Sequence, residues 1–377
     1  MGMRDRSEGG KIRYAVVGLG HISQVAVLPA FKHASENSEL VALVSGDQEK
    51  LAKLARKYDV DATYTYEQYD ECLQSGKVDA VYIALPNHMH REYTVRAAEA
   101  HVHVLCEKPM AVTEQECEDM IGACEQNRVK LMIAYRLHFE EANLKTIEIA
   151  QSGRIGALRT FASVFTMNVE DESNIRLSPL HMGGGPVYDI GTYCINAARY
   201  LFRDEPIEVS AFNANNGEPR FRNVDEMTSA ILRFPGERLA TFTCSFGAAD
   251  VSEYRIVGTN GDLRMDPAYE YAGELRQFVT IDGKTSEHEF RKRDQFAPEL
   301  VYFSNCIQQN LEPEPSGWEG LSDVRVIRAV LESAATGQPV RLPPATRQLR
   351  PSMMQEMQKP PVRKKPDEIN VRGPSER

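Results

Sequence analysis

The sequence predicts two joined domains, first a doubly wound parallel α/β sheet and then an α+β fold with a large, mostly antiparallel open sheet. A chain of 377 residues is too long for one ordinary hydrophobic core and suits two. Up to about residue 136, apolar runs alternate with helical stretches, which indicates repeated strand–helix–strand units. Beyond that point, longer strands with alternating polarity replace this pattern. We therefore expect domains at residues 1–136 and 137–342, followed by a tail at 343–377.

The predicted strands of the first domain are rich in Val, Ile, Ala and Leu without strict alternation, as expected for strands buried on both faces. These strands are Ile12–Val17, Leu40–Val44, Ala80–Leu85, Val102–Leu105 and Leu131–Ala134. The helices between them are Ile22–Ala34, Gln48–Lys57, Arg91–Glu99 and Glu114–Asn127. Thr113 and Glu116 form a capping box that starts the last of these helices.

The second domain combines helices with longer strands. Its predicted helices are Phe139–Gln151, Pro186–Leu201, Pro298–Gln309 and Asp323–Thr336. Its predicted strands are Thr160–Met167, Ile207–Asn213, Ser229–Phe234, Leu239–Phe246 and Tyr254–Val257. Pro235 and Gly236 predict a tight hairpin between two of these strands.

Composition excludes several classes of protein. Hydrophobic residues make up 42% and charged residues 26%, as in an average soluble globular protein. The net charge of −10, from 54 acidic and 44 basic residues, argues against a nucleic-acid partner. No apolar run approaches the roughly 20 residues of a membrane span, and the charged start does not resemble a signal peptide. We expect a cytoplasmic protein with no membrane partner, and seven scattered cysteines that are reduced and mostly buried.

The tail differs from the rest of the chain in charge. Residues 343–377 contain eight Lys or Arg, four Asp or Glu and seven Pro, a charge of about +4. Such a segment cannot bury much surface by itself. We expect it to be either disordered or an arm laid over a partner subunit.

A glycine motif follows the first predicted strand. In Gly18-Leu19-Gly20-His21-Ile22-Ser23, the first glycine suits a tight turn and the second lets the backbone approach a pyrophosphate. The following helix N-terminus offers unpaired N–H groups to that anion. Ser23 stands where the third glycine of the motif is usual. Because the motif follows a strand and opens a helix, it favours a Rossmann dinucleotide site over an ordinary glycine turn.

The end of the second predicted strand favours NADP as that dinucleotide. NAD sites usually place an acidic side chain there to hold the ribose hydroxyls. This chain instead has Ser45 and Gly46, with Lys50 five residues after Ser45. A hydroxyl and an ammonium suit a 2′-phosphate, which a carboxylate would repel. Asp47 lies close enough to keep NAD as the alternative.

Two more motifs stand at strand ends, where open α/β sheets bind their ligands. Glu107-Lys108-Pro109 makes Lys108 a candidate for the reaction centre, against the usual reading of a surface lysine before a turn. Leu85-Pro86-Asn87-His88 is placed to wall a nicotinamide. Two histidine pairs are also present, at His88/His90 and His101/His103. They lack a cysteine or clear carboxylate partner, so we expect no metal.

The second domain contains a run of three glycines, starting at Gly183, followed by Asp189 and Tyr193. Asp189 and Tyr193 are four residues apart, so on a helix they share one face. The glycines permit close approach of backbone or ligand. Taken alone, a core aromatic and a helix-start charge remain the simpler interpretation.

Together these motifs resemble the Gfo/Idh/MocA oxidoreductases, most of all the glucose–fructose and aldose–aldose oxidoreductase branch. The similarity covers about Lys11 to Pro343 and includes G-L-G-H-I-S, E-K-P-M, Tyr135-Arg136 and G-G-G-x-x-x-D-I-G-x-Y. Many relatives carry histidine where this chain has Tyr193, and tyrosine there is typical of the aldose branch. The glucose–fructose enzyme has an export signal and an N-terminal arm over its cofactor, and we expect neither here.

The resemblance implies site residues as well as a fold. Lys108, Asp189 and Tyr193 correspond to the family's catalytic group. The expected cofactor-binding residues are Gly18, Leu19, Gly20, His21, Ile22, Ser45, Gly46, Lys50, Tyr66, Leu85, Pro86, Asn87, His90, Glu107, Lys108, Arg136, Arg176 and Tyr271. Relatives use the open sheet of the second domain to form dimers, often paired into tetramers, so we expect a homo-dimer or homo-tetramer.

The implied reaction transfers hydride between C1 of an aldose and a tightly bound NADP, with a second sugar as a further hydride acceptor. Tyr193 would take the hydroxyl proton. A free tyrosine is a poor base at neutral pH, and a nearby Lys108 ammonium would favour its phenolate. Two alternatives remain open: a sugar dehydrogenase or reductase with exchangeable NAD(P), and a nucleotide-sensing regulator without catalysis. The intact set of Lys108, Asp189 and Tyr193 argues against the regulator.

Overall fold

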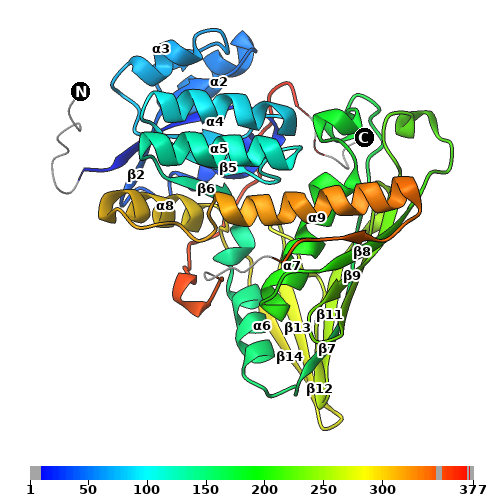
Figure 1. The fold of residues 1–377 in the computed structure, drawn as a ribbon. Helices are drawn as coiled ribbons and strands as arrows, with labels where there is room; N and C mark the ends of the chain where they lie inside the picture. The colour runs from blue at the N-terminus through cyan, green and yellow to red at the C-terminus, as the bar shows by residue number, and fades with distance from the viewer. Residues whose placement is uncertain (1–9, 345–349, 372, 374–377) are drawn as a thin grey trace.

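The computed structural model describes residues 10–344, 350–371 and 373, and its two sheets follow one another along the chain (Figure 1). The first sheet is six-stranded and parallel throughout, in the order β3-β2-β1-β4-β5-β6. The second is nine-stranded and mostly antiparallel, in the order β14-β13-β12-β11-β7-β10-β9-β8-β15. Both sheets agree with the predicted fold class, which is confirmed.

The first sheet contains the five predicted strands and one more. Its strands are β1 Ile12–Val17, β2 Ser38–Val44, β3 Ala62–Tyr64, β4 Ala80–Ile83, β5 His103–Glu107 and β6 Leu131–Ala134. The helices are α1 Leu28–Ala30, α2 Gln48–Tyr58, α3 Tyr69–Gln74, α4 His90–Glu99 and α5 Glu114–Asn127. The capping box of Thr113 and Glu116 is formed, as predicted. β3 and α3 were not predicted because both are short, at three and six residues.

The helix after β1 is shorter than the predicted Ile22–Ala34. A π-helical turn at Ser23–Val27 leads into α1, which ends at Ala30. Pro29 lies within α1 and has no N–H to donate to the preceding turn, which explains the departure from a regular α-helix.

In the part of the chain that the structure describes, helices cover one face of the second sheet. Its strands are β7 Leu158–Asn168, β8 Glu208–Ala214, β9 Met227–Phe234, β10 Arg238–Ser245, β11 Gly247–Gly258, β12 Gly261–Met265, β13 Leu275–Ile281, β14 Lys284–Phe290 and β15 Val340–Arg341. Helices α6 Glu141–Gln151, α7 Thr192–Phe202 and part of α9 Gly317–Thr336 share its core. The hairpin at Pro235 and Gly236 is formed, with Phe234 paired to Arg238.

The other face of this sheet is open. Residues of β9 alternate between buried and exposed along the strand, and Ile231 and Phe212 are 48% and 77% exposed.

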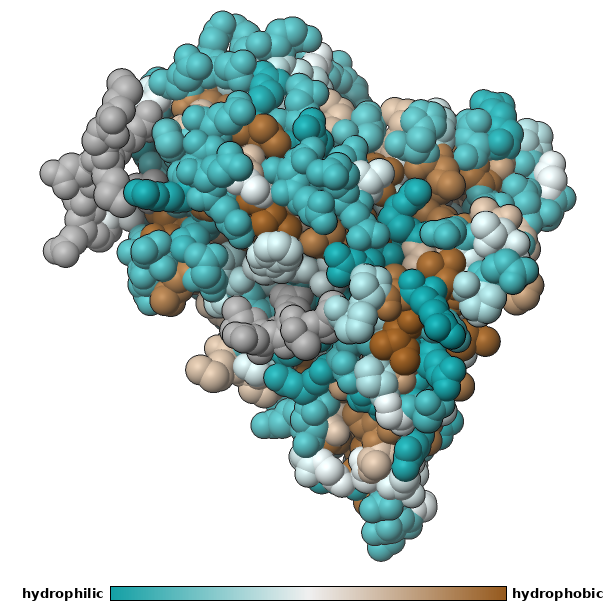
Figure 2. Space-filling model, viewed as in Figure 1, coloured by the Kyte–Doolittle hydropathy of each residue, from teal (hydrophilic) through white to brown (hydrophobic). Residues whose placement is uncertain are grey.

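The view in Figure 2 is mostly hydrophilic, with hydrophobic residues showing in separate patches. No helix among the described residues is long and apolar enough to cross a membrane. All seven cysteines are buried free thiols.

Two helices from the second half of the sequence also pack on the first domain. Helix α8, Ala297–Gln309, places Leu300 and Phe303 in the core beside β1 and β2. The first half of α9 packs Leu321 against the opposite face of the first sheet. Its second half packs Ile327 into the core of the second domain. The packing of the domains therefore does not follow the linear division at residues 137–342.

The described part of the tail lies against its own chain, a position that was not one of the two predicted for it. Residues 350–371 return to their own chain. Arg350 Nη2 lies 2.8 Å from Glu205 Oε1, and Met357 and Ile369 pack against the first domain's core. These apolar residues, interspersed among prolines and charges, give the segment anchors that its composition does not reveal. Tail residues 345–349, 372 and 374–377 lie outside the described residues, as do residues 1–9.

Candidate active site

A cavity of about 480 Å³ lies where the carboxyl ends of the parallel strands face the second sheet. It opens beside β1 and β4, where the strand order reverses, which is the usual ligand position in such sheets. The predicted site residues that line it are Gly18, Leu19, Gly20, His21, Ile22, Ser45, Lys50, Tyr66, Leu85, Pro86, Asn87, Glu107, Lys108, Arg136, Arg176, Asp189, Tyr193 and Tyr271. Gly46 and His90 do not line it.

The loop after β1 forms a backbone cradle. Gly18 has φ of +92°, and a Cβ there would lie 2.5 Å from the carbonyl oxygen of Ala84, so only glycine fits. A Cβ at Gly20 would meet no atom within 4 Å, so its backbone is open to a ligand. Ser23 Oγ donates to the carbonyl oxygen of Gly18 at 2.6 Å and closes the turn. This open backbone at the start of a helical segment fits a pyrophosphate.

Ser45, Lys50 and Tyr66 line the part of the cavity beside β2. Asp47 caps α2 by accepting from the backbone N–H of Lys50 at 3.0 Å. The Lys50 ammonium lies 3.9 Å from Asp47 Oδ2, longer than a hydrogen bond. A cation held this loosely beside a hydroxyl fits a ribose phosphate. Gly46 lies behind them, and a Cβ there would be 3.2 Å from the Tyr66 ring.

The loop after β4 joins the two domains across the cavity. Asn87 Nδ2 donates to the carbonyl oxygen of Gly183 at 2.7 Å. His90 is fully buried behind this loop, with ring nitrogens 2.9 Å from the Leu85 carbonyl oxygen and 3.0 Å from that of Pro109. Burial lowers the pKa of His90. The His90 ring therefore connects the loop after β4 to the loop after β5.

Lys108 and Arg176 meet at Asp189. Lys108 Nζ donates to Asp189 Oδ1 at 3.0 Å, and Arg176 Nε donates to Asp189 Oδ2 at 2.6 Å. Burial acts to raise the pKa of Asp189, but the charges of Arg176 and Lys108 outweigh it and hold that pKa well below its usual range. Burial acts to lower the pKa of Lys108, but the charge of Asp189 leaves it raised. Asp189 is therefore a carboxylate and Lys108 an ammonium at neutral pH.

Tyr193 stands between two cations. The π-helical turn Val187–Gly191, with Asp189 in it, leads directly into α7, so Asp189 and Tyr193 reach the same cavity. Lys108 Nζ lies 4.7 Å from the centroid of the Tyr193 ring, and Arg136 Cζ lies 5.0 Å from it. These distances suit cation–π attraction. Developing negative charge on the phenol oxygen would have two cations nearby.

Several residues that hold this arrangement were not predicted. The guanidinium of Arg136 is buried and donates to Gln295 Oε1 and to the carbonyl oxygen of Tyr269. The rings of Phe165 and Tyr269 pack on Tyr193, with centroids 5.6 and 5.7 Å away. The three residues that were not predicted, Gln295, Phe165 and Tyr269, come from separate second-domain segments and belong to no local motif.

Glu107 adds a buried carboxyl group at the end of β5. Its Oε1 accepts from the Tyr82 hydroxyl at 2.8 Å, and burial raises its pKa. Within residues 10–344, 350–371 and 373, no group of three or more His, Cys, Asp or Glu side chains is arranged to hold a metal ion.

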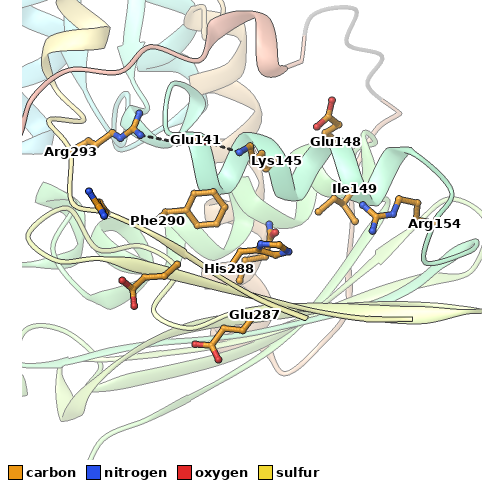
Figure 3. Close-up of a pocket in the computed structure, with 12 residues that line it drawn as sticks. Glu141, Lys145, Glu148, Ile149, Arg154, Glu287, His288, Phe290 and Arg293 are labelled. Carbon is orange, nitrogen blue, oxygen red and sulfur yellow. Dashed lines mark hydrogen bonds and ion pairs between the residues drawn. The ribbon is translucent and has the colours of Figure 1, made fainter. Parts of the chain in front are cut away.

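A second opening, of about 720 Å³, runs along α6 and β14 (Figure 3). Three of its charged groups pair with one another: Glu141 lies 2.7 Å from Lys145 Nζ and 3.3 Å from Arg293 Nη2. None of the predicted site residues lines it. The cavity between the domains is therefore the candidate active site.

Comparison with known families agrees with this geometry. Residues 12–135 match a family model described as the oxidoreductase family with an NAD-binding Rossmann fold. Residues 144–264 match the GFO/IDH/MocA C-terminal domain. The chain belongs to the Gfo/Idh/MocA oxidoreductase family. Membership confirms the predicted resemblance and the enzyme class, an NAD(P)-dependent oxidoreductase.

Individual relatives in the family are similar over most of their length. D-xylose 1-dehydrogenase [NADP(+)] of Haloarcula marismortui is 34% identical over 336 residues, covering 88% of this chain and 93% of the relative. D-xylose 1-dehydrogenase (NADP(+)) 2 of Haloferax volcanii is 31% identical, covering 87% and 99%. The crystal structure of aldose-aldose oxidoreductase from Caulobacter crescentus complexed with glycerol is 37% identical, with a TM-score of 0.84, covering 88% and 100%.

Proposed function

We propose that this oxidoreductase transfers hydride between C1 of an aldose and a tightly bound NADP, with a second sugar as a further hydride acceptor. One observation carries the proposal: Tyr193, flanked by Lys108 and Arg136, faces the same cavity as the glycine loop. Support also comes from relatives named as NADP-dependent xylose dehydrogenases and as an aldose-aldose oxidoreductase.

The residues beside β2 favour NADP over NAD. Lys50 and Ser45 offer an ammonium and a hydroxyl to a 2′-phosphate, while Asp47 is engaged as the cap of α2. A carboxylate free to hold ribose hydroxyls is what an NAD site requires. When bound, NADP supplies the hydride acceptor for aldose oxidation and, once reduced, the hydride donor for the second sugar.

The proton is handled by Tyr193. As the C1 hydride leaves the ring form of the sugar, the phenolate oxygen of Tyr193 takes the proton of the C1 hydroxyl, which yields a lactone and a neutral tyrosine. Lys108 and Arg136 place two positive charges within about 5 Å of the centre of the Tyr193 ring and so stabilise negative charge on the side chain. Each oxygen of Asp189 accepts one bond from a cation, so each retains acceptor capacity for a sugar hydroxyl.

A Tyr193→Phe variant tests this assignment. It keeps the packing with Phe165 and Tyr269 but removes the proton acceptor. We expect turnover to fall at least a hundredfold while the Kd for NADPH changes less than twofold. Near-normal turnover in this variant would rule out Tyr193 as the proton acceptor.

A second candidate is a simple sugar dehydrogenase with exchangeable NAD(P). Two relatives named as NADP-dependent D-xylose 1-dehydrogenases, 34% and 31% identical, support it. The two functions differ in whether turnover requires added nucleotide.

We further propose that two copies associate through the open face of the second sheet. That face exposes Phe212, Ile231 and Leu239, which are 77%, 48% and 44% exposed. Exposed apolar side chains on three neighbouring strands of one sheet face suit a protein interface. Light scattering on a Phe212→Asp/Ile231→Asp variant should give half the molar mass of the wild type, and an unchanged mass would exclude this face.

A further inference from the structure

Residues Glu368–Asn370, called here the strap, lie against two loops of the nucleotide site. The C-terminal segment, drawn in red, returns from the second domain to the first (Figure 1). It contacts the loops that follow β1 and β2. The aldose-aldose oxidoreductase structure is covered over its whole length by 88% of this chain, so part of this chain has no counterpart there.

The strap is bonded to the loop after β1 through two side chains. Glu368 Oε2 lies 2.6 Å from His21 Nδ1, and these side chains are only 8% and 14% exposed. Gln24 is 1% exposed and bonds the backbone of Ile369 twice, accepting from its N–H at 2.8 Å and donating to its carbonyl oxygen at 3.0 Å. The same Gln24 amide donates to the carbonyl oxygen of Leu19 at 2.9 Å. The strap is therefore connected directly to the glycine loop.

Asn370 bonds the strap to the loop after β2. Its Nδ2 donates to Asp47 Oδ2 at 3.1 Å and to Glu49 Oε2 at 3.0 Å. Asp47 is also the carboxylate 3.9 Å from the ammonium of Lys50. Carboxylates near that lysine compete with a phosphate for its charge. Asn370 thus holds one such competitor, Asp47, toward the strap.

These two loops would hold different parts of one dinucleotide. The glycine loop suits the pyrophosphate and the β2 loop suits the adenosine ribose with its 2′-phosphate. We propose that the strap slows the release of bound NADP by tying the two loops together. The inference rests on the nucleotide site of the proposed function and is independent of the sugar reaction.

The tail does not need the strap to stay in place. Arg350 lies 2.8 Å from Glu205, Gln355 Nε2 donates to the carbonyl oxygen of Glu314 at 2.9 Å, and Lys359 Nζ lies 2.6 Å from Glu36. None of these three anchors contacts the loops after β1 and β2. If the strap only stabilised the fold, its loss would lower the stability of the protein and leave the rate of nucleotide release unchanged.

The experiment measures NADPH release by stopped flow, following the loss of bound-nucleotide fluorescence after mixing with excess NADP. It compares the wild type with Glu368→Ala/Asn370→Ala and with Lys359→Ala as the matched control. Lys359→Ala breaks another tail ion pair, the one with Glu36, away from the nucleotide loops. A chain ending at Pro366 keeps all three anchors and removes the strap entirely.

We expect the double variant and the shortened chain to release NADPH about tenfold faster, since several hydrogen bonds are lost. Lys359→Ala should stay within twofold of the wild type. Equal release rates in the wild type and the double variant would overturn the inference, and so would equal acceleration in Lys359→Ala. If the shortened chain does not fold, the double variant decides. No sugar is present, so the result stands apart from any failure of aldose oxidation.

Discussion

Lys108 and Asp189 are joined twice across the domain boundary. The Lys108 ammonium donates to the backbone carbonyl oxygen of Asp189 at 2.8 Å and to its carboxylate at 3.0 Å. Lys108 follows β5 of the first sheet, while Asp189 lies in the turn before α7 of the second domain. The pair therefore fixes the ammonium relative to Tyr193, whose ring centroid is 4.7 Å away.

Removing the Lys108 charge should slow the chemical step more than it weakens binding. In Lys108→Met, no ammonium remains to stabilise negative charge on Tyr193, and we expect kcat to fall a hundredfold or more. Steady-state kinetics with an aldose, alongside NADPH binding, measures both effects. Lys145→Met is the matched control, because Lys145 also pairs with a carboxylate, that of Glu141, but lies outside the candidate site. A kcat within threefold of the wild type would exclude this role.

Asp189 should also matter for stability. Asp189→Asn leaves Lys108 and Arg176 beside each other without their shared anion. We expect the free energy of unfolding to drop by about 3 kcal/mol, as when one partner of a buried pair is removed. Urea denaturation measures this change. Adding Arg176→Met to the variant should recover part of the loss, and an unchanged free energy in Asp189→Asn would contradict the account.

Glu205 predicts how stability changes in acid. Burial acts to raise its pKa, but the charges of Arg199 and Arg350 outweigh it and hold the pKa at about 2. Because this is below the unfolded value of about 4.3, its contribution is present above pH 4.3 and is lost as pH falls toward 2. The difference in unfolding free energy between the wild type and Glu205→Gln should therefore shrink over that window. A difference that does not change with pH would contradict the ion pairing.

Lys50 should set the preference for NADP. We expect Lys50→Ala to raise the Kd for NADP about tenfold and the Kd for NAD less than twofold, because only NADP carries the 2′-phosphate. Lys53→Ala is the control: Lys53 lies on the same helix, pairs with Glu49 and does not line the cavity. Fluorescence titration with both nucleotides measures the two Kd values. An equal loss of affinity for NADP and NAD would exclude Lys50 as a ligand of the 2′-phosphate.

The parts of the site that follow strands could be predicted from the sequence. Gly18, Asn87 and Lys108 each follow a buried parallel strand, and all parallel strands end at one edge of a sheet. Adjacent motifs thus become neighbours in space. His90 also lies close after a strand, β4, but its ring packs behind the loop and not in the cavity. The sequence pattern does not distinguish a side chain that faces the cavity from one that faces away.

The remaining parts depend on packing between distant segments. Phe165 and Tyr269 meet Tyr193 only because β7 and the loop after β12 lie beside α7. Strand β14 escaped prediction because nearly all its residues are exposed, so it lacks apolar alternation. The return of the tail depends on a few scattered apolar residues such as Ile369, which composition does not single out.

The most direct test follows the near-ultraviolet absorbance and fluorescence of the purified protein, with no nucleotide added, before and after an aldose such as xylose or glucose. We expect a reduced-nicotinamide signal to appear with the aldose and to fade when a second sugar is supplied. A signal that appears only after NADP or NAD is added would show that the cofactor is exchangeable and not resident. No signal under either condition, in protein shown to bind NADPH, would contradict aldose oxidation at this site.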